Sequence, residues 1–388
     1  MFFELKILLI KIYTFLLSYI IFFLNFILRI NFFIQQKNLV NWIIIAQKAN
    51  NTFGISKGFS YIKLAKYLNG WHKEYPETTG YLLPTLLKLS LKKIYPYENI
   101  LSIADWLLDI QKIDGSYKGG TVDSVDESSI FDTGQVIKGI YSLYKYNNNS
   151  KYLDSVLRAC DWIVKSENSN KGYWSKFKSK ALKDYDITFN IYVADIIAKI
   201  GNEISNCDYV NLAKRVGNYT LNKIRPNFWV EGCELPYIKY PVTHTLAYTI
   251  EGLYNVGCEL NNVDFITKST KVLDVIIKKI GNNGYLSGYF DDNWKELNFG
   301  SCLTGNAQIG CLCMKVYKVN GNIFYLIAAK KIYNYLSLRI NNYFKNFGGG
   351  IGSLPGSWPI NGRYFAYANP NWTIKYMLDL SILIEEQV

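Results

Sequence analysis

Polar and apolar positions alternate in a repeating pattern along most of this chain. A polar lead-in, a Thr or Asn and then an apolar run at helical spacing occur six times, anchored on Thr79, Thr133, Thr188, Thr243, Thr304 and Asn371. The intervals between these anchors are 54, 55, 55, 61 and 67 residues, which is typical of a repeated supersecondary unit. Between the anchors lie further helical segments that end near a Gly and an aromatic residue, as in "ADWLLDIQKIDGSY" at 104–117.

The two kinds of segment predict two kinds of helix. Val136, Ile137 and Ile140 follow helical spacing, and "QIGCLCMKV" is apolar almost all round, which is typical of a helix enclosed by its neighbours. We therefore expect inner helices after the anchors, with the Thr and Asn anchors as N-caps, and outer helices between them. Six such pairs predict an all-α fold, an (α/α)6 barrel or α/α toroid of six helical hairpins, as one domain over residues 38–388.

The segment 1–37 is strongly apolar. Lys6, Lys11 and Arg29 surround an apolar run over 12–28, which is near the lower limit for a membrane span, and no small-residue cleavage site follows it. One expectation is a helix that anchors the protein at a membrane. The alternative is an apolar outer helix that packs on the domain.

Composition narrows the class of protein. Hydrophobic residues make up 49% of the chain and charged residues 19%, as in a packed globular protein. The net charge of +12 favours an acidic glycan or an anionic membrane surface as partner. The sequence contains no basic stripe or recognition motif for nucleic acid, so we expect no such partner.

The cysteines and histidines bear on cofactors and on cell compartment. Seven scattered cysteines without a CxxC pair predict reduced thiols in a cytoplasmic protein rather than a disulfide framework or a zinc site. Two histidines, His72 and His244, exclude a His-rich metal centre. We expect neither a metal nor a cofactor.

A toroid would bring all connections that lead into inner helices to one rim. The expected rim segments are 71–78, 115–132, 172–187, 229–242, 284–303 and 348–370. Most are longer than ordinary connections, and long ordered loops are often functional. The helix N-termini that they precede would favour an anionic ligand.

The rim segments supply the candidate site residues. The catalytic candidates are Tyr75, Glu77, Asp132, Tyr240 and His244. The substrate-binding candidates are Trp71, His72, Glu74, Asp186, Glu234, Trp358, Arg363, Tyr364, Tyr367 and Asn369. Carboxylates, aromatic rings and an arginine together suit carbohydrate, because rings stack on sugars and carboxylates move protons. Structural alternatives remain: Glu77 and Asp132 could be helix-capping residues, and His244 could be a hydrogen-bonded core histidine.

Several of these motifs are also familiar as a set. "YPETTGYLLPTLL", "FDTGQVIKGIYSLY", "PVTHTLAYTIEGL", "SCLTGNAQIG" and "GSWPINGRYFAYANPNWTIKY" resemble a family of bacterial surface-polysaccharide-cluster proteins with an α/α-toroid fold, often labelled squalene cyclase-like or prenyltransferase-like. The chain has no Asp-x-Asp-Asp acid motif and no Asp, Cys and His zinc set, so the label implies a fold rather than a chemistry. A fainter similarity is to the catalytic domain of glucuronyl 5-epimerases, carried by "EYP" at 74–76.

These observations leave several functions open. The leading hypothesis is a carbohydrate-active enzyme of surface polysaccharide or glycolipid assembly, epimerase-like or lyase-like on an acidic glycan or a lipid-linked saccharide. Tyr75, Tyr240 and His244 would then transfer protons, and Arg363 and Asn369 would hold the sugar carboxylate. The alternatives are a six-hairpin glycoside hydrolase with carboxylates paired from Glu77, Asp132, Asp186 and Glu234, a non-catalytic glycan-binding protein, and a terpene cyclase.

Overall fold

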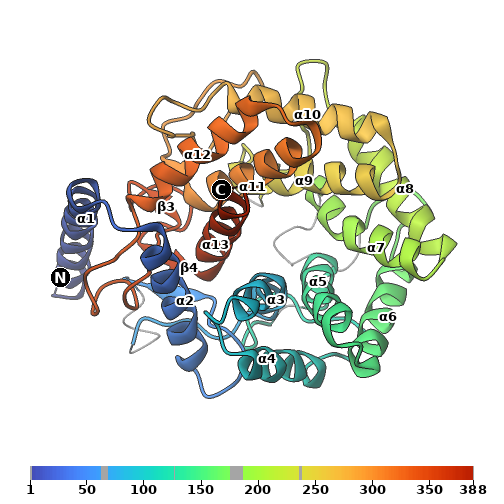
Figure 1. Cartoon of the computed structure of the whole chain (residues 1–388), viewed down its shortest axis with the longest axis horizontal. Helices are drawn as coiled ribbons and strands as arrows, with labels where there is room; N and C mark the ends of the chain where they lie inside the picture. Colours follow the sequence, from blue (N-terminus) through green and yellow to red (C-terminus); the bar gives the residue numbers. More distant parts are fainter. Residues whose placement is uncertain (1, 63–68, 126, 175–186, 236–237, 388) are drawn as a thin grey trace. The chain divides into compact units, whose positions relative to one another are not determined.

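The computed structural model describes residues 2–62, 69–125, 127–174, 187–235 and 238–387, and it is mostly helical (Figure 1). The predicted all-α class is confirmed. The chain forms two compact units. Unit 1 comprises Met1–Glu74, Lys279–Phe290 and Glu296–Val388, and unit 2 comprises Tyr75–Lys278 and Asp291–Lys295.

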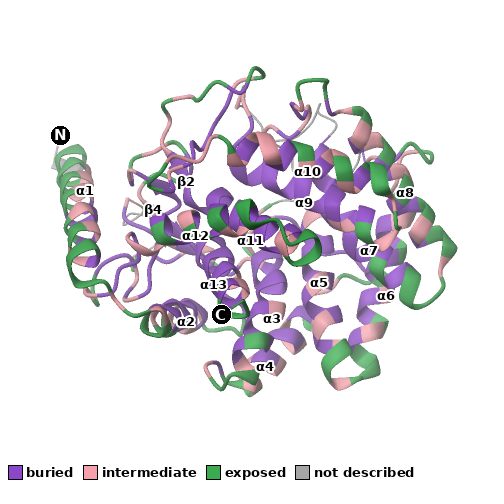
Figure 2. Ribbon diagram, turned by 45° about the horizontal axis from the view of Figure 1, so that its top comes forward, coloured by how far each residue is buried: buried purple, intermediate pink, exposed green. Residues whose placement is uncertain are grey.

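Unit 2 contains alternating inner and outer helices joined in sequence. They are α3 (Pro76–Leu91), α4 (Tyr97–Asp109), α5 (Ile130–Asn147), α6 (Ser150–Lys165), the 3-10 helix η2 (Thr188–Asn190), α7 (Ile191–Glu203), α8 (Cys207–Asn222), α9 (Thr243–Glu259) and α10 (Val263–Ile277). Helix α5 packs against α3 and α7, and α7 packs against α9, so the predicted inner helices are neighbours. The inner helices are buried over most of their surface, whereas α6 and α8 each expose one face (Figure 2).

Unit 1 contains the remaining helices and all the strands. The helices are α1 (Phe2–Leu28), α2 (Phe32–Lys48), α11 (Leu303–Asn320), α12 (Ile323–Ser337) and α13 (Asn371–Glu385). Strand β1 (Gly58–Ser60) pairs antiparallel with β4 (Ala368–Pro370), and β2 (Ser301–Cys302) pairs antiparallel with β3 (Ser357–Trp358). Helix α11 packs on α12 and α13, and α13 packs on α2. The segment 1–37 is thus divided between α1 and α2, since Arg29 has a left-handed backbone and Asn31 caps α2.

The Gly-and-aromatic signature of the outer segments has a packing cause. Gly115 has φ +92°, and a Cβ there would lie 2.3 Å from the carbonyl oxygen of Arg158 on α6, the next outer helix. In unit 1, a Cβ on Gly284 would lie 2.1 Å from the carbonyl oxygen of Lys331 on α12. The repeat therefore keeps glycine where a loop turns against the backbone of the following outer helix.

The predicted role of the Thr and Asn anchors as N-caps is wrong. The caps are other residues, such as Ser129 for α5 and Val242 for α9, and the anchors lie inside the first helical turn or in η2. The Thr133 hydroxyl donates to Ser129 O at 2.7 Å and accepts from Tyr117 N at 3.0 Å. Thr133 is buried, and its hydroxyl ties the preceding loop to α5 instead of capping the helix.

All seven cysteines lie among the described residues, and each is a free thiol. Five are buried, while Cys207 and Cys258 are exposed.

Candidate active site in unit 2

Three predicted residues meet at the start of the inner helices α3 and α5. Tyr75 is the N-cap residue of α3, Glu77 lies in the first turn of α3, and Asp132 lies in the first turn of α5. The Tyr75 hydroxyl hydrogen-bonds to both carboxyl groups. The two side chains are each 6% exposed. The loops before two repeats thus supply a buried carboxyl pair linked by one phenol.

Asp132 is held by several donors. Its Oδ1 accepts from Gly120 N at 3.0 Å and its Oδ2 from Ser129 Oγ at 2.5 Å, and Ser129 Oγ accepts from Asp132 N at 3.3 Å. Ser129 is the N-cap residue of α5, and its hydroxyl joins the backbone and the carboxyl of Asp132. The arrangement is not a capping box, because the Ser129 N–H donates to Tyr117 O instead of to Asp132. Burial nevertheless outweighs these donors and raises the pKa of Asp132. A carboxyl group that keeps its proton to higher pH suits a general acid.

Tyr75, in contrast, is poorly suited to act as a base. Burial, followed by the negative charges of Asp132 and Glu77, raises the pKa of the Tyr75 hydroxyl well above its ordinary value. The phenol therefore stays protonated at neutral pH. It can donate a hydrogen bond or relay a proton, but it is a weak candidate for a free phenolate base.

His244 lies near this cluster, on the inner helix α9, which packs against α7. It is in the first turn of α9, and its ring centroid is 4.3 Å from that of Tyr248 one turn later. Tyr248 in turn lies 5.0 Å from Phe131 on α5, and it is an electrostatic neighbour of Tyr75. His244 is 7% exposed and belongs to an aromatic wall next to the carboxyl pair.

Gln135 is a site candidate that the sequence analysis did not single out. It lies one helical turn after Phe131 and one before Lys138 on α5, so the three share a face. The Gln135 side chain is fully buried, and neither its amide nitrogen nor its oxygen bonds to any residue within the described ranges. A buried amide without partners is unfavourable by about 1–3 kcal/mol, so its retention beside the carboxyl pair points to a ligand contact. Only the position of the glutamine, three residues after Asp132 and directly before the apolar pair Val136 and Ile137, could have indicated it.

A partly buried ion pair lies on the same face of α5. Lys138 Nζ is 2.9 Å from Asp195 Oδ1 on α7, and it lies 3.1 Å from the ring centroid of Tyr192. Asn255 on α9 donates to Asp195 Oδ2 at 2.9 Å. This network joins three inner helices one turn beyond Gln135. The sequence patterns did not single it out, because each member looks like an ordinary helix residue.

The other candidates of unit 2 lie in the connection before α9. Glu234 is partly buried, and burial raises the pKa of its carboxyl above the usual range. Tyr240 is half-buried, with Lys239 Nζ 5.0 Å from its ring centroid. Neither bonds to the Tyr75 cluster in any contact recorded for the described residues. Asp186 lies outside the described residues.

In unit 1, four predicted binding residues take part in packing. Trp71 is buried against Trp42 at a ring distance of 5.0 Å, and Trp358 against Tyr19 at 4.9 Å. Tyr364 accepts from Trp372 Nε1 at 2.8 Å. Asn369 donates to Tyr61 Oη at 3.1 Å and to Gly348 O at 3.0 Å.

Glu74 also holds unit 1 together. Its Oε1 accepts from the Thr52 hydroxyl, and its backbone forms a bridge with Ser56. The neighbouring His72 is half-buried, and its carbonyl accepts from Ser56 Oγ at 2.7 Å.

Arg363 and Tyr367 are the more accessible candidates of unit 1. The Arg363 guanidinium lies 4.6 Å from the ring centroid of Phe299 and 5.8 Å from that of Tyr289, and its side chain is exposed. Tyr367 is half-buried, with Lys11 Nζ 5.9 Å from its ring centroid. An exposed guanidinium held over an aromatic ring keeps its donors available for a carboxylate or phosphate.

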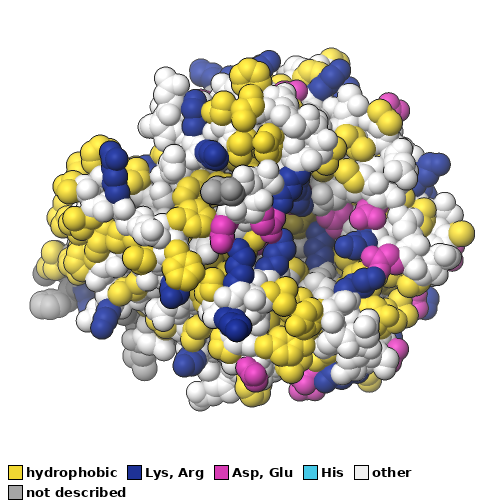
Figure 3. Space-filling model, in the orientation of Figure 1, with side chains coloured by type: hydrophobic (Ala, Val, Ile, Leu, Met, Phe, Trp, Pro, Cys, Tyr) yellow, Lys and Arg dark blue, Asp and Glu magenta, His cyan; other side chains and the backbone are white. Residues whose placement is uncertain are grey.

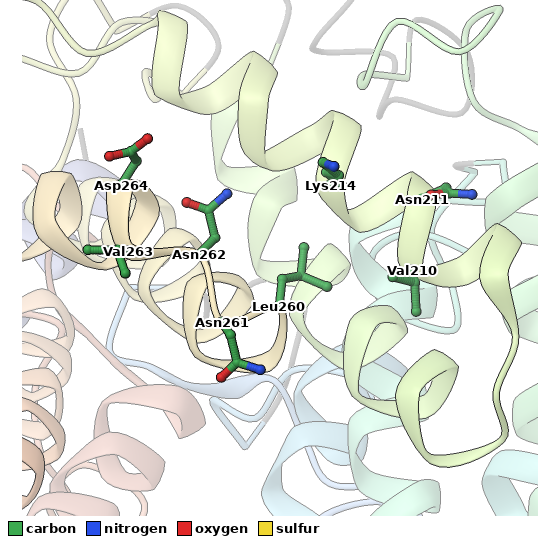
Figure 4. Close-up of a pocket in the computed structure, with 8 residues that line it drawn as sticks. All are labelled: Val210, Asn211, Lys214, Leu260, Asn261, Asn262, Val263 and Asp264. Atoms are coloured by element: carbon green, nitrogen blue, oxygen red, sulfur yellow. The ribbon is translucent and has the colours of Figure 1, made fainter.

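A surface groove of about 510 Å³ lies elsewhere in unit 2 (Figure 4). It is lined by residues of α8 and of the turn from α9 to α10, including Lys214, Asn262 and Asp264. His244 is at the other end of α9, about 24 Å away along a helix of this length. The groove is therefore separate from the carboxyl pair.

Within the described residues, no group of three or more His, Cys, Asp or Glu side chains is placed to hold a metal ion. The donor set at the site is a phenol, two carboxyls and an imidazole, which suits proton transfer without further ligands.

Comparisons with known proteins give a likeness at the level of structure. No protein-family model matches the sequence, and no curated protein matches it. A solved unsaturated glucuronyl hydrolase specific for heparin is similar, with a TM-score of 0.67 and 14% identity over 91% of this chain and 97% of that chain. The cellobiose 2-epimerase of Bacillus thermoamylovorans is similar with a TM-score of 0.69 and 12% identity, over 92% and 100% of the two chains.

A third similar structure is the GH76 α-mannanase of Bacteroides thetaiotaomicron, with a TM-score of 0.66 and 13% identity over 92% of this chain and 97% of that chain. At these identities the likeness concerns the fold. The predicted α/α toroid is confirmed, and the fold is one that these glycan-acting enzymes share.

Proposed function

We propose that the protein is a carbohydrate-active enzyme that hydrolyses a glycosidic bond in an acidic glycan, with Glu77 and Asp132 as its carboxyl pair. The observation that carries this proposal is the Tyr75 hydroxyl, which bonds to two buried carboxyls at the N-termini of adjacent inner helices. A paired acid and base is what glycoside hydrolysis requires. The fold likeness to enzymes named as glucuronyl hydrolases and a mannanase is consistent with it.

In this proposal each side chain has a role. Asp132, whose pKa is raised, donates its proton to the glycosidic oxygen as the C–O bond breaks. Glu77 acts as the carboxylate that removes a proton from the attacking water, whose oxygen forms the new bond to the sugar carbon. Tyr75 can accept the proton from Glu77 while passing its own to Asp132, which restores both groups for the next turnover.

The acidic substrate class follows from charge. The chain carries a net charge of +12. Helix N-termini at the site add partial positive charge. A uronic acid residue in the glycan would be favoured by both. The resemblance to surface-polysaccharide-cluster proteins supports a role in making or modifying such a glycan or a lipid-linked saccharide.

A second candidate is the epimerase-like or lyase-like reaction, favoured by His244. Its imidazole, packed against Tyr248 beside Tyr75, could remove the proton next to a sugar carboxylate. Return of a proton from Tyr75 to the other face would give the epimer, and loss of the leaving oxygen would give an unsaturated sugar.

Product analysis distinguishes hydrolysis from the epimerase-like or lyase-like reaction. Purified protein is incubated with a panel of uronic-acid oligosaccharides in deuterated water. Hydrolysis predicts new reducing ends without ultraviolet absorbance from an unsaturated sugar. Deuterium in an uncleaved sugar, or an unsaturated product, would replace the hydrolytic proposal by the second candidate.

A further inference from the structure

Helix α1 has one face that unit 1 covers and one that it leaves open. The covered face consists of Thr14, Leu17, Ser18, Ile21 and Asn25, all buried. The open face, which we name the outer stripe, follows helical spacing along the other side and consists of Leu5, Leu9, Ile12, Leu16, Ile20, Phe23 and Ile27, all exposed. By length and composition the helix is apolar enough to cross a membrane, and 22% of its most apolar window is buried.

The covered face is part of the folded core of unit 1. Leu17 and Ile21 pack in a cluster with Tyr61, Phe347 and Ile360. The aromatic rings of Tyr19 and Phe22 lie 4.9 and 5.9 Å from Trp358.

Polar contacts also fix this helix on the body. Asn25 Nδ2 donates to Leu338 O at 3.0 Å and to Ile340 O at 2.8 Å, and Asn25 Oδ1 accepts from Asn342 Nδ2 at 2.8 Å. These partners belong to a non-helical connection. Irregular backbone is not tolerated in the hydrocarbon of a bilayer unless protein covers it, so a helix docked in this way does not run across the membrane.

The charged residues around the outer stripe indicate what kind of surface it binds. Lys6 near the start of α1, Arg29 just after its end and Lys37 on α2 are exposed, and Glu4 is the one acidic residue of α1. Phe33 and Ile34 extend the apolar surface onto α2. Figure 3 displays hydrophobic side chains gathered over α1 with basic ones beside them. An apolar stripe flanked by lysine and arginine is the pattern of a helix that lies in the interface of an anionic membrane.

We infer that α1 docks unit 1 onto an anionic phospholipid bilayer, lying in the plane of the membrane with the outer stripe among the acyl chains. This inference does not depend on the proposed hydrolysis. It sets an arrangement in which the catalytic protein works at a membrane surface, where a lipid-linked saccharide would be presented.

The first experiment measures co-sedimentation of the full chain with phosphatidylglycerol vesicles and with phosphatidylcholine vesicles. The wild-type protein is expected to bind the anionic vesicles and to bind more weakly as salt rises. The variant Leu9→Glu, Leu16→Glu, Ile20→Glu is expected to lose about a hundredfold or more in vesicle affinity, because three apolar contacts become charges.

A matched control separates the stripe from charge alone. Ile113, Val263 and Val319 are exposed apolar residues away from α1, and their triple Glu variant changes the net charge equally. It is expected to keep vesicle binding. Equal binding by the wild type and the stripe variant would overturn the inference, as would a wild-type dimer that binds no vesicle and becomes a monomer in the stripe variant.

The second experiment measures depth. In a Cys207→Ser, Cys258→Ser background, which removes the exposed thiols, single cysteines at Leu9, Leu16 and Phe23 are labelled with an environment-sensitive dye. Quenching by lipids brominated at different depths is expected to give the same shallow depth for all three labels. A deep central label between two shallow ones would mean a helix that spans the bilayer and would contradict the in-plane arrangement.

Discussion

The hydroxyl of Tyr75 hydrogen-bonds to the carboxyl of Asp132, and thereby links the N-cap of α3 to the first turn of α5. Residues 57 positions apart in the chain thus share one buried polar network. The same hydroxyl bonds to Glu77. Changes at any of the three are therefore expected to affect the other two.

Tyr75→Phe should move the pH dependence of turnover. The Tyr75 hydrogen bond lowers the pKa of Asp132, so removing it raises that pKa further. If Asp132 is the general acid, the alkaline limb of kcat/KM shifts to higher pH while kcat falls about tenfold or more. A pH–rate profile measures this.

The control for that variant is Tyr141→Phe. Tyr141 donates to Glu203 Oε2 at 2.7 Å near the other end of α5 and should leave the profile unchanged. If the alkaline limb of the profile does not shift in Tyr75→Phe, the Tyr75 hydroxyl does not act on the general acid.

Asp132→Asn should change stability in a pH-dependent way. Because the folded pKa of Asp132 is raised, its favourable contribution is present below the unfolded pKa and is lost as the pH rises through the folded pKa. The Asn side chain does not ionise. Its stability relative to wild type should therefore increase as the pH rises above the unfolded Asp pKa of about 4.

Denaturant unfolding at several pH values measures this difference. The value at acid pH accounts for hydrogen bonds lost by the substitution itself. A difference that stays constant across the range would mean that Asp132 is not held in its protonated form by the fold.

Gln135→Met should stabilise the protein and weaken substrate binding. The substitution removes a buried amide that has no hydrogen-bond partner among the described residues, which is expected to raise the free energy of unfolding by about 1–2 kcal/mol. If the amide contacts the glycan, KM rises while kcat changes less. Chemical denaturation and steady-state kinetics measure the two effects.

Gln308→Met on α11 is the matched control. Gln308 is equally buried but has an interaction partner, so its loss should destabilise the protein. A Gln135→Met protein that is less stable and has an unchanged KM would remove Gln135 from the site.

Gly115→Ala should be strongly destabilising. The added Cβ meets the Arg158 carbonyl oxygen at 2.3 Å in a left-handed backbone, with an expected cost of about 3 kcal/mol or more. Gly321, at φ +68° with open space around it, isolates the backbone contribution, and Gly321→Ala should cost about 1 kcal/mol. Equal losses on denaturant unfolding would mean that the close approach of the loop to α6 is relaxed without cost.

The repeat made the helices predictable, because an apolar run at helical spacing after a short polar motif occurs in every hairpin. Tyr75 and Glu77 stood out as candidates in the sequence, since no part of the repeat explains a tyrosine just before α3 and a carboxylate in its first turn. The N-cap residues could not be predicted from the sequence. A threonine in the first turn and a threonine at the cap give the same pattern of letters, and the choice between them depends on which backbone groups the fold buries.

Predicted binding residues could not be told apart from core residues for a similar reason. Trp71, Trp358 and Asn369 have the residue types of a sugar site, yet the structure places them in packing or backbone contacts of unit 1. In a chain with 32 tyrosines and 9 tryptophans, residue type alone does not distinguish a residue that lines a binding site from one that packs in the core. Gln135 and Lys138 went unnoticed because their meaning lies in the neighbours that α5, α7 and α9 bring to them.

The central claim is that the carboxyl pair carries the chemistry, and release of reducing ends from a uronic-acid oligosaccharide tests it most directly. Glu77→Gln and Asp132→Asn are compared with Glu98→Gln and Asp208→Asn, which alter exposed first-turn carboxylates of the outer helices α4 and α8. We predict that each pair variant loses about 10²- to 10⁴-fold in kcat while the outer variants keep wild-type turnover. Wild-type rates in both pair variants, with their fold intact, would contradict the account.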